Sequence, residues 1–274
     1  MLCVAASTAG AAGARDTSAY RGLATWLDIY DTAYWRTPES TVAAMQSRGV
    51  KTLFLETGNS SQNVAVVRPV LVGRLVEAAH AAGLRVVAWY LPTFVHPAID
   101  LRRMLAAIRF RTPQGQRFDS FAFDIEAGDV ASVPTRNARL ASVVAAVRAA
   151  AGPSYPLGAI VPSAIGMALH PKYWPGFPYA TLARSVDVFL PMAYFTYRVK
   201  GRAASAAYVE QSVDLLRAAV GDSVPVHVIG GVAGTASAAD VSGFMDAVAQ
   251  LSPVGYSLYD FPLTTGPIWH ELAP

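Results

Sequence analysis

The chain alternates between helical segments and short apolar runs that are rich in β-branched and aromatic residues. Apolar runs of this length are typical of buried strands, and glycines such as Gly49 and Gly83 separate several of them from the preceding helix. The pattern predicts eight strands, at residues 23–31, 50–56, 84–91, 118–129, 157–161, 186–194, 224–230 and 255–260. It predicts at least seven helices, at residues 38–48, 69–82, 100–111, 135–151, 179–184, 205–220 and 238–251.

This order of elements indicates the fold class. Nearly continuous apolar strands separated by helices are typical of a parallel sheet with helices outside. Eight such units in 274 residues predict an α/β protein with a single (β/α)₈ TIM barrel over residues 20–274. An open doubly wound sheet is the alternative, but residues 31–35 lack the glycines of a dinucleotide-binding turn. The glycines within 230–234 follow the seventh strand, where they form a tight turn or hold a phosphate.

Composition and charge exclude several classes of protein. With 53% hydrophobic and 15% charged residues the chain resembles a well-buried globular domain, and no apolar run is long enough to span a bilayer. The net charge is +3, and the basic residues are too scattered for a nucleic-acid-binding surface. We therefore expect no nucleic-acid partner and no stable membrane insertion.

The first 19 residues differ from the rest. Small apolar residues fill positions 1–14 and resemble the end of a secretory signal without its basic beginning, so this segment is a signal remnant or a tail. As a signal, it predicts a bacterial protein that is secreted or associated with the cell wall. Cys3 is the only cysteine, which excludes a disulfide framework and a thiol nucleophile in the barrel.

The segment at 118–129 carries the clearest chemical signal. Strand side chains alternate between faces, so Asp124 and Glu126 share one face with Ala122, while Phe121 and Phe123 lie on the other. In a barrel the bulky face packs against the helices, and inward residues at the C-terminal end of a strand line the active site.

Other polar and aromatic residues fall at the same ends of neighbouring predicted strands. Aromatic faces between carboxylates are suited to sugars, whose C–H faces stack on rings while the hydroxyls bond to acids. The loop at 170–179 adds Trp174, which we expect, with Trp89, to stack on a sugar ring. The predicted substrate-binding residues are Asp28, Tyr30, Glu56, Trp89, Tyr90, Trp174, Met192, Tyr259 and Asp260.

Two carboxylates on one strand face provide the elements of glycoside hydrolysis. That reaction needs an acid that protonates the leaving oxygen and a second group that stabilises or attacks the sugar centre. Glu126 is the predicted general acid/base, and Asp124 is its partner. Repulsion between the two would raise one pKa of the pair toward the working pH.

The strand resembles that of family 18 glycoside hydrolases, the chitinase-like barrels. Asp119-x-x-Ala122-x-Asp124-x-Glu126 is similar to their Asp-x-x-Asp-x-Asp-x-Glu, and Met192-Ala193-Tyr194 is similar to their Met-x-Tyr. The resemblance implies that Glu126 is the acid, that Asp124 orients an acetamido group acting as internal nucleophile, and that Tyr194 supports this group. Ala122 departs from the family pattern, and the chain as a whole resembles uncharacterised actinobacterial glycoside-hydrolase-like barrels.

Several alternatives stay open. Without help from an acetamido group, Asp28, Glu56 or Asp260 would be the second carboxylate, and Asp28 with the strand-four pair also resembles the family 25 muramidases. A barrel that binds glycan without cleaving it is the alternative from another class. We expect no cofactor and no metal, although Asp28, Glu56, Asp124 and Glu126 together would suit Mg²⁺ or Ca²⁺.

Overall fold

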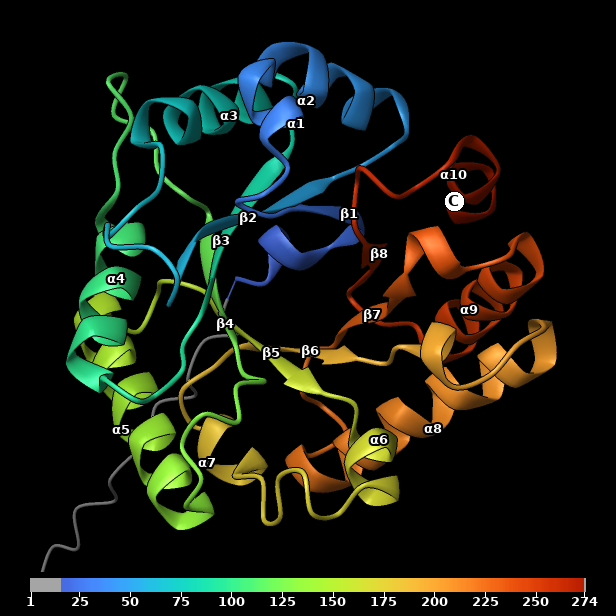
Figure 1. The fold of residues 1–274 in the computed structure, drawn as a ribbon. Coiled ribbons are helices and arrows are strands. Elements are labelled where there is room, and N and C mark those ends of the chain that lie inside the picture. The colour runs from blue at the N-terminus through green and yellow to red at the C-terminus, as the bar shows by residue number, and fades with distance from the viewer. Residues whose placement is uncertain (1–15, 274) are drawn as a thin grey trace, which may run out of the picture.

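The computed structural model describes residues 16–273, which form a closed barrel of parallel strands surrounded by helices (Figure 1). Each strand pairs with the next along the chain, and β8 closes the barrel by pairing with β1. The strands are β1 (Gly22–Leu27), β2 (Thr52–Asn59), β3 (Arg85–Leu91), β4 (Ser120–Asp124), β5 (Leu157–Pro162), β6 (Val188–Met192), β7 (His227–Val232) and β8 (Gly255–Tyr259). The prediction of a single (β/α)₈ barrel is confirmed.

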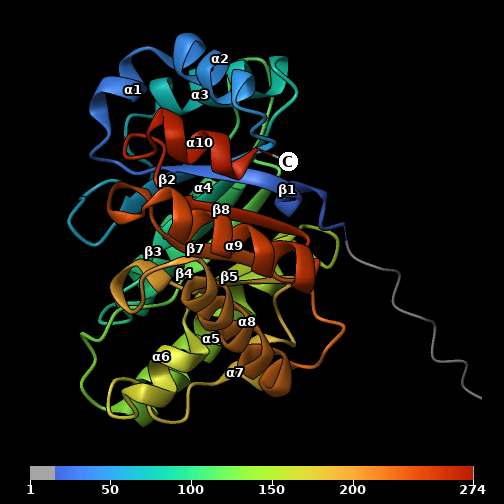
Figure 2. The same cartoon turned by 90° about the vertical axis from the view of Figure 1, so that its right-hand side faces the viewer.

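The helices form the outer layer, and in the side view α8 and α9 cross the outside of the strands (Figure 2). The α-helices are α1 (Thr32–Arg36), α2 (Pro38–Ser47), α3 (Pro69–Ala81), α4 (Pro97–Arg109), α5 (Val133–Ala151), α6 (Ala164–Leu169), α7 (Tyr179–Leu182), α8 (Arg202–Val220), α9 (Ala238–Leu251) and α10 (Gly266–Leu272). Three short 3₁₀ helices are η1 (Ser18–Tyr20), η2 (Phe195–Tyr197) and η3 (Ala233–Thr235). None of these helices is both long and apolar enough to cross a membrane.

Local sequence explains where several helices begin. Proline opens α2, α3 and α4, where its missing N–H would have no intrahelical partner. A capping box opens α9, because the Ser237 hydroxyl accepts from Asp240 N–H while the Asp240 carboxylate accepts from Ser237 N–H. The helices α1, α6 and α10 are only five, six and seven residues long, and they were not among those predicted.

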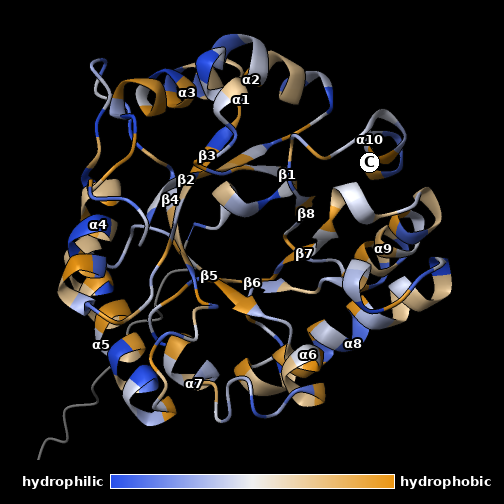
Figure 3. Cartoon of the chain, viewed as in Figure 1, coloured by the Kyte–Doolittle hydropathy of each residue, from blue (hydrophilic) through white to orange (hydrophobic). Residues whose placement is uncertain are grey.

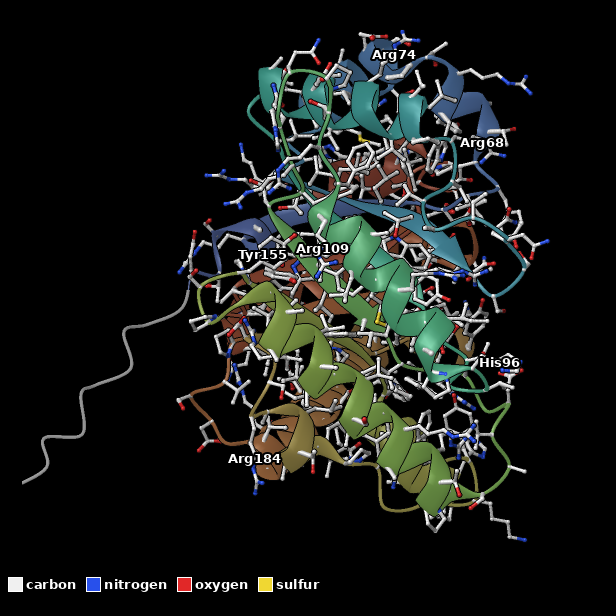
Figure 4. All side chains as sticks on the ribbon, turned by 90° about the vertical axis from the view of Figure 1, so that its left-hand side faces the viewer. Arg68, Arg74, His96, Arg109, Tyr155 and Arg184 are labelled. Carbon is white, nitrogen blue, oxygen red and sulfur yellow. The ribbon has the colours of Figure 1, made fainter. Side chains whose placement is uncertain are left out.

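Apolar side chains pack in two layers. In Figure 3 the hydrophobic colour recurs along the strands and along the helices around them. Phe121, Phe123 and Ile125 belong to the layer between strands and helices, whereas Ala122 belongs to the barrel interior, as the strand alternation predicts. Figure 4 looks onto α4 and α5, with His96 at one end of α4 and Arg109 at the other. The helices thus enclose the barrel wall along its length, and the residues at the strand ends are left to line the mouth.

Tyr20 fills the N-terminal end of the barrel. Its side chain is fully buried, and its hydroxyl lies 2.6 Å from Ser120 Oγ. Gly158 leaves room for it, because a Cβ there would lie 2.6 Å from the Tyr20 hydroxyl oxygen. The predicted boundary between tail and barrel at residue 20 therefore lies inside a packed segment, since Ala19 is buried as well. Residues 1–15, which carry the signal prediction, lie outside the described residues.

Candidate active site

A cavity of about 330 Å³ opens at the C-terminal ends of the strands. Of the residues predicted for the site, it brings together Asp28, Tyr30, Glu56, Trp89, Asp124, Glu126, Met192, Tyr194 and Tyr259. Side chains from all of β1 to β8 or the loops after them contribute to its lining. The rule that strand ends of a barrel converge on one site therefore holds for most of these residues.

Asp124 is the last residue of β4, and Glu126 follows it in the loop. The Asp124 side chain is buried and its Oδ1 has no hydrogen-bond partner among residues 16–273. Burial raises the pKa of Asp124 well above its usual value, and the charges of Glu126 and Glu56 raise it further. Glu126 is exposed to the open part of the cavity, yet the surrounding walls still desolvate its carboxyl group and raise its pKa.

Glu56 lies on β2 beside a bulge. The register of β2 against β3 shifts between Glu56 and Gly58, so Glu56 and Asn59 both reach the cavity although regular alternation would separate them. Glu56 Oε2 accepts from Ile29 N–H at 2.9 Å, and Oε1 accepts from Asn59 Nδ2 at 3.0 Å. Burial is the main cause that raises the pKa of Glu56 to about 7.

A second acidic group lies at the end of β1. Asp28, Asp31 and Asp260 each offer a carboxylate oxygen, and these oxygens lie within 4.8 Å of one another. Asp28 Oδ2 accepts from the Tyr259 hydroxyl at 2.7 Å, and its Oδ1 accepts from backbone N–H groups. Burial raises the pKa of Asp31 to about 7 and also raises that of Asp260. A divalent cation would fit this geometry, but the cluster is already held by its own hydrogen bonds and differs from the four-acid set considered from sequence.

Asp260 does not line the cavity itself. Its side chain is buried beside Asp28, and its Oδ1 accepts from Leu263 N–H at 3.1 Å. Direct contact of Asp260 with a substrate is therefore not supported by its position.

Aromatic rings form the floor of the cavity. Trp26 stacks on Phe54 at 4.1 Å between ring centroids and meets Trp89 edge-on at 5.9 Å. Trp26 Nε1 donates to Ser257 Oγ, but the buried Trp89 Nε1 has no partner among the described residues. Sequence reasoning missed Trp26 as a site residue. Trp26 lies two residues before Asp28, so the alternation of side chains along the chain places both on one face. This spacing is the feature of the sequence that could have identified Trp26.

Tyr90 is not in the cavity, which corrects its predicted role. It follows Trp89 on β3 and therefore points to the opposite face, toward the helices. The Tyr90 hydroxyl donates to Asp100 Oδ1 at 2.8 Å and accepts from Arg103 Nη1 at 3.1 Å. Tyr90 is thus a structural residue between β3 and α4.

Trp174 also lies away from the cavity. It is only 2% exposed, and its Nε1 donates to Asn137 Oδ1 at 2.7 Å. The Arg136 guanidinium lies 3.9 Å from the ring centroid and covers one face. Trp174 therefore fixes its loop onto α5, and neither the ring face nor the N–H is available to a sugar, contrary to the prediction. Its neighbour Tyr173 is exposed instead, and its hydroxyl donates to the Glu126 carbonyl oxygen.

Tyr194 and Met192 form the wall after β6, together with Tyr197 of η2. The rings of Tyr194 and Tyr197 lie 6.1 Å apart. Burial raises the pKa of Tyr194 well above its usual value, and the charges of Asp124 and Glu126 raise it further. Tyr194 therefore remains a neutral hydroxyl near the two acids, able to donate or accept a hydrogen bond.

Comparisons with known proteins support the fold assignment. No protein-family model matches the sequence, and no curated protein matches it either. Solved structures do match. The spore cortex-lytic enzyme SleL of Bacillus cereus has a TM-score of 0.67 at 9% identity, over 94% of this chain and 74% of SleL.

Two further matches come from other organisms. A glycoside hydrolase family 18 N-acetylglucosaminidase of Paenibacillus barengoltzii has a TM-score of 0.62 at 12% identity, over 92% of this chain and 99% of the enzyme. The endo-β-1,4-mannanase of Thermotoga petrophila has a TM-score of 0.66 at 10% identity, over 89% and 68%. The resemblance to family 18 barrels is therefore confirmed at the level of the fold, which chitinases and mannanases share.

Proposed function

We propose that the protein is a glycoside hydrolase in which Glu126 is the general acid. The observation that carries the proposal is the position of Glu126, which borders both the cavity at the barrel mouth and a neighbouring groove of about 500 Å³. A glycosidic bond between two sugars, one in each space, would lie against its carboxyl group. The raised pKa keeps a larger share of Glu126 protonated near neutral pH, as a general acid requires.

In the proposed reaction Glu126 first donates a proton and later takes one back. Glu126 donates its proton to the glycosidic oxygen as the bond from that oxygen to the anomeric carbon breaks. A water molecule then supplies hydroxide to the anomeric carbon, and its remaining proton returns to Glu126. The hydrolysis consumes one water and leaves the enzyme unchanged.

Asp124 is proposed to contact the sugar in the barrel mouth. It is buried and protonated to a higher pH than an ordinary aspartic acid, and one of its oxygens has no hydrogen-bond partner among residues 16–273. A buried polar atom in this state gains a hydrogen bond when a ligand supplies the partner. Together with the neutral Tyr194 hydroxyl, Asp124 offers a place for a polar substituent of the sugar, such as the acetamido group implied by the family 18 resemblance.

The structural neighbours support the reaction class but not a particular glycan. The matched proteins are named for a cortex-lytic, an N-acetylglucosaminidase and a mannanase activity, so one fold accompanies different substrates. Asp28 lines the same cavity as Asp124 and Glu126, so the family 25-like muramidase variant is a second form of the same proposal.

A barrel that binds glycan without cleaving it is the alternative function. Ala122 favours it, because this inward residue of β4 leaves Asp124 without the carboxylate neighbour that family 18 strands have. Binding alone would need the aromatic floor and the polar wall but no titrating Glu126.

A hydrolysis screen tests the proposal. Wild type, Glu126→Gln and Asp129→Asn are incubated with chitin oligomers, peptidoglycan and plant and bacterial polysaccharides. Asp129 is a matched control, since it is an exposed acid in the same loop that lines neither the cavity nor the groove. We expect cleavage by wild type and Asp129→Asn, and a loss of at least about 100-fold in Glu126→Gln. Equal turnover in Glu126→Gln would refute the role of Glu126, and glycan binding without cleavage would favour the alternative.

A further inference from the structure

The groove beside the barrel mouth differs from the mouth in shape and in charge. It lies between the β5–α6 segment and the start of α8, and it shares Glu126, Met192, Tyr194 and Tyr197 with the mouth. The two spaces are therefore continuous, and Glu126 lies at their border.

The charged residues of the two spaces have opposite signs. Within the described part of the chain, the mouth is lined by the carboxyl groups of Asp28, Glu56, Asp124 and Glu126 and by no lysine or arginine. The groove is lined by Arg198 and His170, and Glu126 at the border is its only acid. A ligand that occupies both spaces meets acids at one end and a cation at the other.

Arg198 is held in the groove without being neutralised. Its Nη1 donates to His170 Nε2 at 3.1 Å, and it forms no ion pair with a carboxylate of residues 16–273. Arginine has only donors, so this bond uses the unprotonated nitrogen of His170. By contrast Arg74, Arg148 and Arg202 each form an ion pair. Arg198 therefore keeps most of its donors for a ligand.

The remaining lining is suited to a sugar ring. Tyr173, Tyr197 and Tyr208 supply aromatic surface, and Met167 supplies a flexible apolar contact. Aromatic faces beside an arginine that has no carboxylate partner among residues 16–273 suit a ring that bears a carboxylate, because the guanidinium can bind a carboxylate through two parallel hydrogen bonds.

We propose that the groove holds the sugar on the leaving-group side of the cleaved bond and that Arg198, oriented by His170, binds a carboxylate on that sugar. The substrate is then an acidic glycan, with an anionic unit in the groove and a neutral unit in the mouth. The groove offers a cation for a carboxylate and the described lining of the mouth offers none, so this charge pattern fixes the direction in which the glycan lies. This inference rests on the proposed hydrolase function for the assignment of the two sides, but the carboxylate contact itself can be measured as binding.

The test measures binding in the Glu126→Gln background, so that cleavage does not interfere. The probes are tetrasaccharides of hyaluronan and of peptide-free peptidoglycan, in which anionic and neutral units alternate. Each is compared with its carboxyl-reduced form, in which the carboxylate has become a primary alcohol, and with neutral chitotetraose and mannotetraose. Titration calorimetry is run on proteins that add Arg198→Ala, Arg198→Lys or Arg202→Ala. Arg202→Ala is the matched control, because it removes an exposed arginine outside the groove.

We expect an acidic probe to bind best, and its Kd to rise about 10-fold to 100-fold on carboxyl reduction or in Arg198→Ala. Arg198→Lys should recover part of the affinity, Arg202→Ala should change little, and the reduced probe should not respond to Arg198→Ala. The proposal would be overturned if a neutral probe bound most tightly or if no acidic probe bound. It would also be overturned if carboxyl reduction or Arg198→Ala changed the Kd by less than about 2-fold. If wild type cleaves none of the screened glycans, the hydrolase assignment fails while the binding comparison keeps its meaning.

Discussion

The buried carboxyl group of Glu56 makes a prediction about stability that can be worked out from the structure. Glu56 is 2% exposed, so solvent screens it little. In the unfolded chain its pKa is the ordinary 4.5, whereas burial raises the folded-state pKa to about 7. Below pH 4.5 both states hold the proton. As pH rises toward 7 the unfolded state releases it more readily, so the free energy of unfolding falls across this window.

The magnitude follows from the two pKa values. At 1.36 kcal/mol for each pH unit between them, wild type loses about 3 kcal/mol between pH 4 and pH 8 through this one residue. Glu56→Gln cannot lose this stability, because the glutamine side chain does not titrate. The variant keeps an acceptor for Ile29 N–H but gives up the bond from Asn59 Nδ2, which costs about 1 kcal/mol. We therefore expect Glu56→Gln to be less stable than wild type by about 1 kcal/mol at pH 4 and more stable by about 2 kcal/mol at pH 8.

Urea unfolding of both proteins at pH 4, 6 and 8 measures the effect. Asp31, Asp124 and Asp260 also have raised pKa values, so wild type loses further stability over this range. The difference between variant and wild type reports the titration of Glu56 together with its charge effect on Asp124. A difference that stays constant from pH 4 to pH 8 would refute the reasoning.

Two further substitutions test other features of the barrel. Trp89→Phe removes a buried N–H that has no hydrogen-bond partner among the described residues, so the free energy of unfolding should change by less than about 1 kcal/mol. The affinity for a bound glycan should fall about 5-fold or more. Unchanged affinity in calorimetry would mean that this N–H contacts no ligand atom. Gly243→Ala would place a Cβ against the Arg202 carbonyl oxygen where α8 and α9 pack closely. The clash should outweigh the gain of about 1 kcal/mol in helix propensity and lower stability by at least about 2 kcal/mol, and a more stable variant in thermal unfolding would contradict the close packing.

The sequence predicts the barrel well because the fold depends on a repeated local pattern. Each strand is a short apolar run, and each helix has its own start or stop signal, so α9 was predicted at its observed bounds. The strand ends were less well predicted. Strand four was expected to continue past Asp124, but pairing ends there and Glu126 lies in the loop.

The candidate site was predicted in part, and its errors have separate causes. Strict alternation on β3 could have excluded Tyr90 once Trp89 was placed inward. Trp174 could not be judged in this way, because its burial depends on Arg136 and Asn137 of a distant helix. The bulge at Gly58 likewise depends on pairing between β2 and β3, so no local signal places Asn59 beside Glu56.

The position of Tyr20 has a consequence for product release. Because its side chain and the inner apolar cluster fill the barrel below the cavity, the mouth is a cup with one opening. A cleaved sugar cannot pass through the barrel, and the neighbouring groove shares Glu126, Met192, Tyr194 and Tyr197 with the wall of the mouth. A unit released in the cup must therefore leave through the opening of the cup before the next glycan can bind, which makes its departure a step that competes with bond cleavage in setting the rate.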